Sequence, residues 1–77
     1  MDKSLSYIVG QRIKEIRNEK KISQQDLASK CNFEKSNMSR IEAGRTDPKL
    51  STLDKISQGL EVELTELFKF PKRKQSK

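Results

Sequence analysis

Small and polar side chains are spaced along residues 34–43, EKSNMSRIEA, so that they fall on one side of a helix. At roughly 100° per residue, Met38 and Ile41 share one direction, which we expect to be buried. The opposite side carries Ser36, Ser39, Arg40 and Ala43. Lys35 and Asn37 flank this stripe in the first turn. Such side chains can hydrogen-bond to base edges in a DNA major groove, although the pattern also suits an ordinary solvated helix face.

The chain offers few residues for catalysis or metal binding. It has no histidine, and Cys31 is its one cysteine, which excludes an internal disulfide and a Cys/His zinc site. Acid–base and nucleophilic schemes lack the side chain that titrates near neutral pH. We therefore expect no enzyme activity, cofactor, metal or small-molecule ligand. Cys31 is interpreted as a small buried residue rather than a functional thiol.

Length and charge favour one small domain with an anionic partner. The 77 residues, 31% of them hydrophobic, support a single core. No apolar run approaches the ~20 residues of a membrane span, and the N-terminus lacks the apolar region of a secretory signal, so a cytoplasmic protein is expected. The net charge is +6, of which residues 69–77 contribute +5. A basic protein favours polyanionic partners such as nucleic acid.

Hydrophobic spacings of three and four residues predict five short helices and no strands. The helices are expected over about 5–20, 24–31, 34–43, 50–60 and 64–68. Ser23 is a good N-cap, and Asn32 tolerates the left-handed conformation of a sharp turn. Gly44 is placed to end the third helix, and Ser51 and Asp54 have the spacing of a capping box. We predict an all-α domain over residues 1–68, followed by a basic, disordered tail over 69–77.

Residues 9–68, about four-fifths of the chain, resemble the helix-turn-helix domain of the lambda-type phage repressors and Cro, the XRE-like family. The matching segments are RIKEIRNEKKISQQDLA, SNMSRIEAG, and DPKLSTLDKI followed by LFKF. Ten residues match at one register without a gap: Gln24, Leu27, Ala28, Ser39, Ile41, Glu42, Gly44, Pro48, Leu53 and Ile56. The resemblance implies a compact five-helix, lambda repressor-like fold and a transcriptional regulator that binds double-stranded DNA without a cofactor.

The resemblance also implies a role for individual residues. A helix lying in the major groove would read bases through Lys35, Ser36, Asn37 and Arg40, with Asn37 contacting a base or the adjacent backbone. Phosphates would be bound by Gln24, Arg45, Thr46 and Lys49. Arg17 and Glu42 would form a structural ion pair between the first and third helices. Two residues depart from the family pattern: Asn32 stands where glycine is commonest, and Glu34 places a carboxylate at the start of the reading helix.

A two-fold homodimer is expected, because one reading helix contacts only a few base pairs. An apolar patch near the end of the domain is the candidate interface: Leu64, Leu67, Phe68 and Phe70. The alternative is that the first three cap the core and leave only Phe70 exposed. The basic tail is open to three interpretations, namely a solvated end, a phosphate tether or part of a partner surface.

Three biological settings remain open: a phage-type repressor, a controller of a restriction–modification locus, and a toxin–antitoxin repressor. The competing class is a helical protein-interaction module, such as an antitoxin or adaptor, that does not read a DNA sequence. An acidic or apolar outer face on the third helix would favour that class. Ser36, Arg40, Arg45 and Lys49 argue against it.

Overall fold

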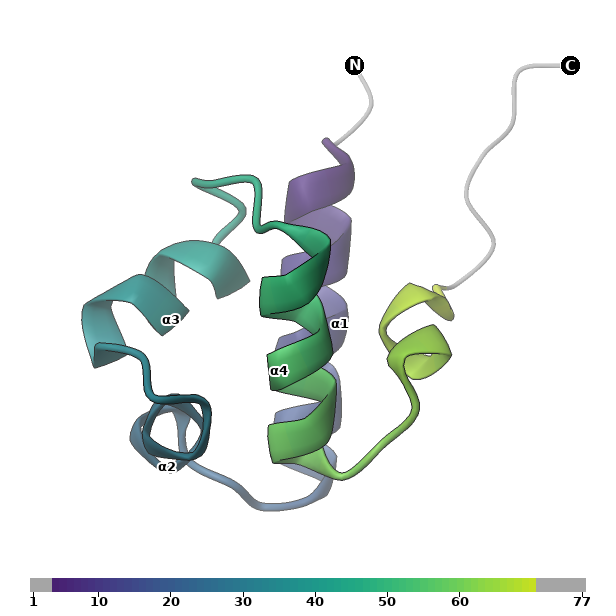
Figure 1. The fold of residues 1–77 in the computed structure, drawn as a ribbon. Coiled ribbons are helices and arrows are strands. Elements are labelled where there is room, and N and C mark those ends of the chain that lie inside the picture. The colour runs from purple at the N-terminus through teal and green to yellow at the C-terminus, as the bar shows by residue number, and fades with distance from the viewer. Residues whose placement is uncertain (1–3, 71–77) are drawn as a thin grey trace, which may run out of the picture.

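The computed structural model describes residues 4–70, which form helices and no strands (Figure 1). The elements are α1 (Leu5–Glu19), α2 (Gln24–Cys31), α3 (Lys35–Glu42), α4 (Leu50–Leu60) and the 3-10 helix η1 (Leu64–Phe68). The predicted all-α class is confirmed, but residues 4–70 contain four α-helices and not five. The fifth segment has only 5 residues, too few to stabilise an α-helix, and adopts the tighter 3-10 form. Residues 71–77 of the predicted tail lie outside the described residues.

Every element contributes to one hydrophobic core. Figure 1 shows α4 running alongside α1, with α2 and α3 on one side and η1 on the other. The buried hydrophobic residues are Val9, Ile13, Ile16, Leu27, Ala28, Cys31, Met38, Ile41, Leu53, Ile56, Leu60 and Leu67. Leu67 carries η1 into this core with no exposed surface. These positions follow the helical spacing of the sequence, so hydrophobic burial fixes which side of each helix faces inward.

Local capping determines where the helices begin and turn. The Ser4 and Ser23 hydroxyls accept from the backbone N–H groups of Tyr7 and Asp26, at 3.2 and 3.0 Å. Each therefore satisfies an otherwise free donor in a first turn. The capping box expected at Ser51 and Asp54 is absent. The N-cap of α4 is Lys49, which forms no side-chain cap, and Ser51 lies inside the helix.

An ion-pair cluster ties η1 to α1. Arg12 Nε donates to the Glu66 carbonyl oxygen at 2.8 Å, and its Nη2 lies 3.4 Å from Glu66 Oε1. On the other side, Lys69 Nζ lies 2.9 Å from Glu66 Oε2. The hydrogen bond from Lys69, together with the positive charges of Lys69 and Arg12, lowers the pKa of Glu66. The short 3-10 helix is thus held by backbone and side-chain contacts as well as by Leu67.

Cys31 lies among the core residues, where its Sγ approaches the Lys55 carbonyl oxygen at 3.5 Å. Burial raises the pKa of this thiol, an effect that nearby Lys55 partly opposes. Residues 4–70 hold no group of three His, Cys, Asp or Glu side chains able to bind a metal ion. No helix within the same range is long and apolar enough to cross a membrane.

Gly10 allows α1 and α3 to approach closely. A Cβ atom added at this position would overlap the carbonyl oxygens of Ile41 and Glu42, the latter at 2.6 Å. Both obstacles are backbone atoms at the end of α3, so they cannot move without displacing the helix. The glycine therefore costs helix propensity in α1 but positions α3 against it.

We expect Gly10→Ala to lower the free energy of unfolding by about 1–3 kcal/mol, because overpacking outweighs the ~1 kcal/mol of helix propensity that alanine gains. Gly59→Ala is the matched control within α4. Its added Cβ would lie 3.0 Å from Leu27 Cδ1 and 3.1 Å from Cys31 Sγ, which are side-chain atoms that can shift. Urea unfolding followed by circular dichroism measures both. A Gly10→Ala protein at least as stable as Gly59→Ala would contradict the close-approach explanation.

Candidate nucleic-acid interface

The candidate site is built on α2 and α3 and on the turn between them. Asn32 ends α2 with φ 64°, and the backbone N–H of Phe33 donates to the Ala28 carbonyl oxygen at 2.8 Å. This left-handed residue redirects the chain over a very short distance. Met38 and Ile41, 0% and 2% exposed, then seat α3 on the core. The outer face of α3 is therefore presented by a rigidly packed helix.

The exposed face of α3 matches the side predicted from helical spacing. Ser36, Ser39, Arg40 and Ala43 are exposed, as is Lys35 in the first turn. Glu42, by contrast, is only 3% exposed. The side chains nearest the middle of this face are short, which allows a partner to approach the backbone. Lys35 and Arg40 provide longer donors at either end. Their contacts with DNA bases remain predictions.

Asn37 differs from the other predicted base-reading residues because it is half-buried. It lines a hollow of about 260 Å³ between α3 and the start of α4. Thr46, Lys49 and Thr52 contribute polar groups to the same hollow. Thr52 was not predicted from the sequence as a binding residue. The available signal was its position three residues after Lys49, in the first turn of α4. Asn37 is thereby grouped with two of the predicted phosphate-binding residues.

The loop after α3 is formed by backbone hydrogen bonds. Gly44 adopts φ 76°, and its N–H donates to the Ile41 carbonyl oxygen at 3.1 Å. Arg45 N–H donates to the Arg40 carbonyl oxygen at 2.9 Å. These bonds turn the chain sharply at the C-terminal end of α3. Arg45 and Lys49 are consequently exposed on the segment that leads from α3 to α4.

A buried ion pair holds α3 to α1. Arg17 Nε lies 2.8 Å from Glu42 Oε2, and Arg17 Nη2 lies 3.0 Å from Glu42 Oε1. The two side chains are 10% and 4% exposed, so the pair is almost entirely shielded from water. Arg17 Nη1 also donates to the Ile22 carbonyl oxygen at 3.0 Å. This two-point contact fixes the orientation of α3 as well as its distance from α1.

Gln24 joins the same network. Its Nε2 donates to Glu42 Oε1 at 3.1 Å, which connects the first residue of α2 to the last residue of α3. The resemblance implied a phosphate contact for Gln24 and did not reveal this bond. An amide nitrogen carries two hydrogens, so one donor remains for a second partner. The phosphate role of Gln24 stays a prediction, and the residue has a structural role in addition.

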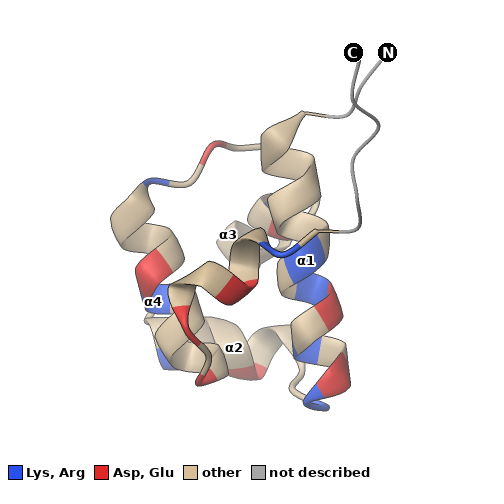
Figure 2. Cartoon of the chain, turned by 90° about the vertical axis from the view of Figure 1, so that its right-hand side faces the viewer, with Lys and Arg blue, Asp and Glu red and all other residues tan. Residues whose placement is uncertain are grey.

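The charges of the described residues are unevenly distributed. Lys35, Arg40, Arg45 and Lys49 are all exposed on α3 and the loop that follows it. The segment 50–68 instead carries a charge of −3. Figure 2 faces the side away from α3 and shows acidic residues along the segment that follows α4. Basic residues of α1 appear in the same view, so positive charge lies on both sides of the described residues, and the four exposed cations on the α3 side suit a polyanion.

The predicted dimer residues are separated by the fold. Leu67 is 0% exposed, so it belongs to the core of the monomer and offers no surface to a partner. Leu64 and Phe70 are partly buried against that core. Phe68 is 39% exposed and forms an edge-to-face contact with Phe70, with ring centroids 6.3 Å apart. The patch predicted from sequence is thus reduced mainly to Phe68.

Comparison with known proteins identifies the family. A helix-turn-helix family model matches residues 13–67. The immunity repressor of Bacillus phage phi105 is 44% identical over 57 residues, which cover 74% of this chain and 40% of the repressor. The chain belongs to this helix-turn-helix family. The predicted XRE-like membership is confirmed.

Two further relatives are a bridging factor and a biofilm regulator whose structure was solved with DNA. Multiprotein-bridging factor 1 of Candida glabrata is 42% identical over 62 residues, covering 80% of this chain and 41% of the factor. The crystal structure of SinR, a master regulator of biofilm formation, in complex with DNA is similar with a TM-score of 0.72 and 40% identity. That match covers 79% of this chain and 98% of the SinR chain. The chain spans about two-fifths of the length of the phage repressor and of the bridging factor.

Breaking the Arg17–Glu42 pair from one side is expected to cost about 3–5 kcal/mol of unfolding free energy, because the remaining charge stays buried without its partner. The test compares Arg17→Met, Glu42→Leu and the double variant by urea unfolding. The double variant should lose much less than the sum of the single losses, since neither charge is left alone. Additive losses would mean that the pair is not coupled in solution.

Proposed function

We propose that the chain is a sequence-specific DNA-binding transcriptional regulator, a repressor or autoregulator that acts without a cofactor. The observation that carries the proposal is the exposed face of α3, whose donors project from a helix fixed by the Arg17–Glu42 pair. Family membership and the DNA complex of SinR support it. Rigid placement matters, because hydrogen bonding to base edges tolerates little displacement of the reading helix.

In this proposal α3 lies in the major groove. Lys35 and Arg40 donate to guanine, while Ser36 hydrogen-bonds to a neighbouring base. Small side chains at Ser39 and Ala43 let the helix enter deeply. Glu34, the N-cap of α3, makes no base contact in this proposal. Its carboxylate instead places a negative charge at the positive end of the helix dipole.

Phosphate contacts set the register of α3 in the groove. Gln24 binds a phosphate on one side of the helix, using the amide hydrogen that Glu42 does not take. Arg45, Thr46 and Lys49 bind phosphates on the other side. The hollow beside them supports this assignment, because Asn37 and Thr52 add two uncharged donors around the same space. Asn37 is therefore assigned to the backbone contact rather than to a base.

A two-fold homodimer completes the proposal. Two copies would place their α3 helices about 34 Å apart, which is one turn of the duplex, and so read a palindromic operator. A monomer has one reading helix and would bury too little surface for strong discrimination between sequences. The similarity to a phage immunity repressor supports the repressor role.

A second candidate is a protein-interaction module. It is favoured by the 42% identity to multiprotein-bridging factor 1, whose name denotes bridging between proteins. The acidic residues of the segment that follows α4, on the side away from α3, would then contact a basic protein. The regulator remains the better supported proposal, because the α3 side itself is basic and polar.

Selection of preferred duplexes from a random DNA pool at about 0.15 M salt tests the function directly. We expect enrichment of a two-fold symmetric sequence, read out by sequencing after several rounds. The Arg40→Ala variant, put through the same selection of duplexes, is the control for base recognition by α3. A pool that shows no enriched sequence, with binding lost at moderate salt, would reject the regulator and favour the interaction module.

Arg40 and Arg45 should differ in the kind of loss they cause. Arg40→Ala is expected to cost about 1–3 kcal/mol at its preferred base pair and to relax the preference there. Arg45→Ala should weaken binding to all duplexes alike and reduce the slope of log affinity against log salt by about 1. Fluorescence anisotropy on the selected site and on single-base variants separates the two. Identical behaviour of the variants would overturn the assignment of base and phosphate contacts.

A further inference from the structure

The N-terminal half of α1 lies against the end of α3 and against the loop that follows it. A Cβ atom added at Gly10 would overlap the Ile41 carbonyl oxygen, and one added at Gly44 would lie 2.5 Å from the Tyr7 Cα atom. Both obstacles are backbone atoms, and Tyr7 and Gly10 are one turn apart on α1. Side chains of α1 at this contact are therefore placed to control the direction in which the chain leaves α3.

One of these side chains completes the hydrogen bonding at the end of α3. The last four carbonyl groups of an α-helix have no partner inside the helix. In α3, three of them accept from backbone N–H groups just beyond the helix: Ser39 from Ala43, Arg40 from Arg45, and Ile41 from Gly44. The fourth, the Glu42 carbonyl oxygen, accepts from Nε2 of Gln11 on α1 at 3.2 Å. Gln11 thus supplies the one bond of this C-terminal cap that comes from another helix.

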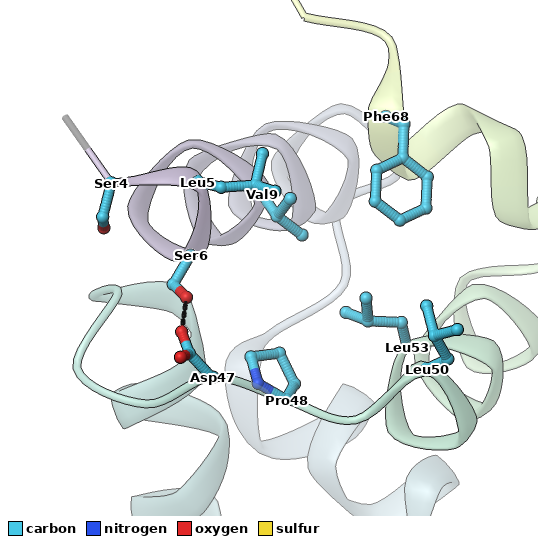
Figure 3. Close-up of a pocket in the computed structure, with 9 residues that line it drawn as sticks. All are labelled: Ser4, Leu5, Ser6, Val9, Asp47, Pro48, Leu50, Leu53 and Phe68. Carbon is cyan, nitrogen blue, oxygen red and sulfur yellow. Dashed lines mark hydrogen bonds between the residues drawn. The ribbon is translucent and has the colours of Figure 1, made fainter. Parts of the chain in front are cut away.

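A second side chain of α1 holds the far part of the loop. The Ser6 hydroxyl donates to the Asp47 carboxylate, as Figure 3 shows. Asp47 and Pro48 also line an apolar groove of about 500 Å³, whose other apolar side chains come from α1, α4 and η1: Leu5, Val9, Leu50, Leu53 and Phe68. Arg45 and Thr46 therefore lie between two points at which α1 holds the chain, the Glu42 carbonyl group and the Asp47 side chain.

We propose that Gln11 is a positioning residue for the phosphate contacts of Arg45 and Thr46, with Ser6 holding the other end of the same loop. This inference rests on the proposed function, which assigns those contacts. Arg45 follows the last turn of α3 directly, because its own N–H donates to the Arg40 carbonyl oxygen at 2.9 Å. A shift of that turn is therefore passed on to the Arg45 side chain.

The orientation of α3 as a whole does not depend on Gln11. Arg17 holds the Glu42 carboxylate at two points, and Met38 and Ile41 are buried in the core. Loss of the Gln11 bond leaves these contacts in place and releases only the end of the helix and the loop beyond it. We therefore expect weaker binding to every duplex with an unchanged preference among bases.

The test replaces Gln11 by methionine, which keeps the length of the side chain and removes its donor. Gln58→Met is the matched control, because Gln58 is also an exposed amide on a helix and donates to Asp54 Oδ2 at 2.9 Å. Fluorescence anisotropy should show that Gln11→Met binds every duplex about 2- to 10-fold more weakly than the wild type, whereas Gln58→Met binds normally. The urea midpoint verifies that both variants remain folded.

Ser6 tests the other end of the loop. Ser6→Ala should weaken binding in the same uniform way, because it removes the hydroxyl that holds Asp47. Ser6→Thr keeps the hydroxyl and should bind like the wild type. Equal affinities for Ser6→Ala and Ser6→Thr would overturn the part assigned to Ser6.

Two further measurements distinguish positioning from a direct contact between Gln11 and DNA. Amide hydrogen exchange in the free protein should be at least about threefold faster at Gly44 and Arg45 in Gln11→Met than in Gln58→Met. In an Arg45→Ala background, Gln11→Met should cost less affinity than it costs in the wild type, because one of the contacts that it positions is already gone.

The outcomes separate this inference from the proposed function. Unchanged exchange at Gly44 and Arg45, wild-type affinity in Gln11→Met, or a loss fully additive with that of Arg45→Ala would each overturn the positioning role and leave DNA reading by α3 untouched. A wild-type protein that binds all duplexes equally would reject sequence-specific regulation alone, since the weaker binding of Gln11→Met is measurable on any duplex.

Discussion

The buried Arg17–Glu42 ion pair is the interaction on which the candidate DNA interface depends. It joins α1 to the last residue of α3, and Gln24 extends it to the first residue of α2, so one carboxylate orients all three helices. Gly10 makes this contact possible by letting the α3 backbone approach α1. A buried pair of charges contributes little net stability but strongly disfavours other arrangements, since any shift leaves a charge unpaired. Orientation of the reading helix is therefore its main effect.

The loop from Gly44 to Lys49 connects the structural and functional parts of the molecule. It begins at the left-handed Gly44, exposes Arg45, and ends at the start of α4, whose first turn lines the polar hollow. Its Asp47 and Pro48 face the apolar groove on the other side. A single short segment therefore lies between the proposed phosphate contacts and the apolar groove.

Much of the fold follows from local features of the sequence. Ile13, Ile16, Met38 and Ile41 have spacings that only a helix places on one side, and they are buried as expected. Asn32 adopts the left-handed turn, and Ser23 caps α2. Two local expectations failed. Ser51 does not cap α4, because the helix begins at Leu50, and the segment 64–68 is too short to remain α-helical.

By itself the sequence determined the helices, their inward sides and the exposed polar stripe of α3, because helical periodicity and capping act over only a few residues. Tertiary structure decided which distant groups meet. It placed Thr52 beside Asn37, engaged Gln24 with Glu42, and took Leu67 out of the predicted dimer patch into the core. It also gathered Leu5, Leu50 and Phe68 around one groove. Such contacts depend on how whole helices pack, and that packing is fixed by long-range burial and by the Arg17–Glu42 pair.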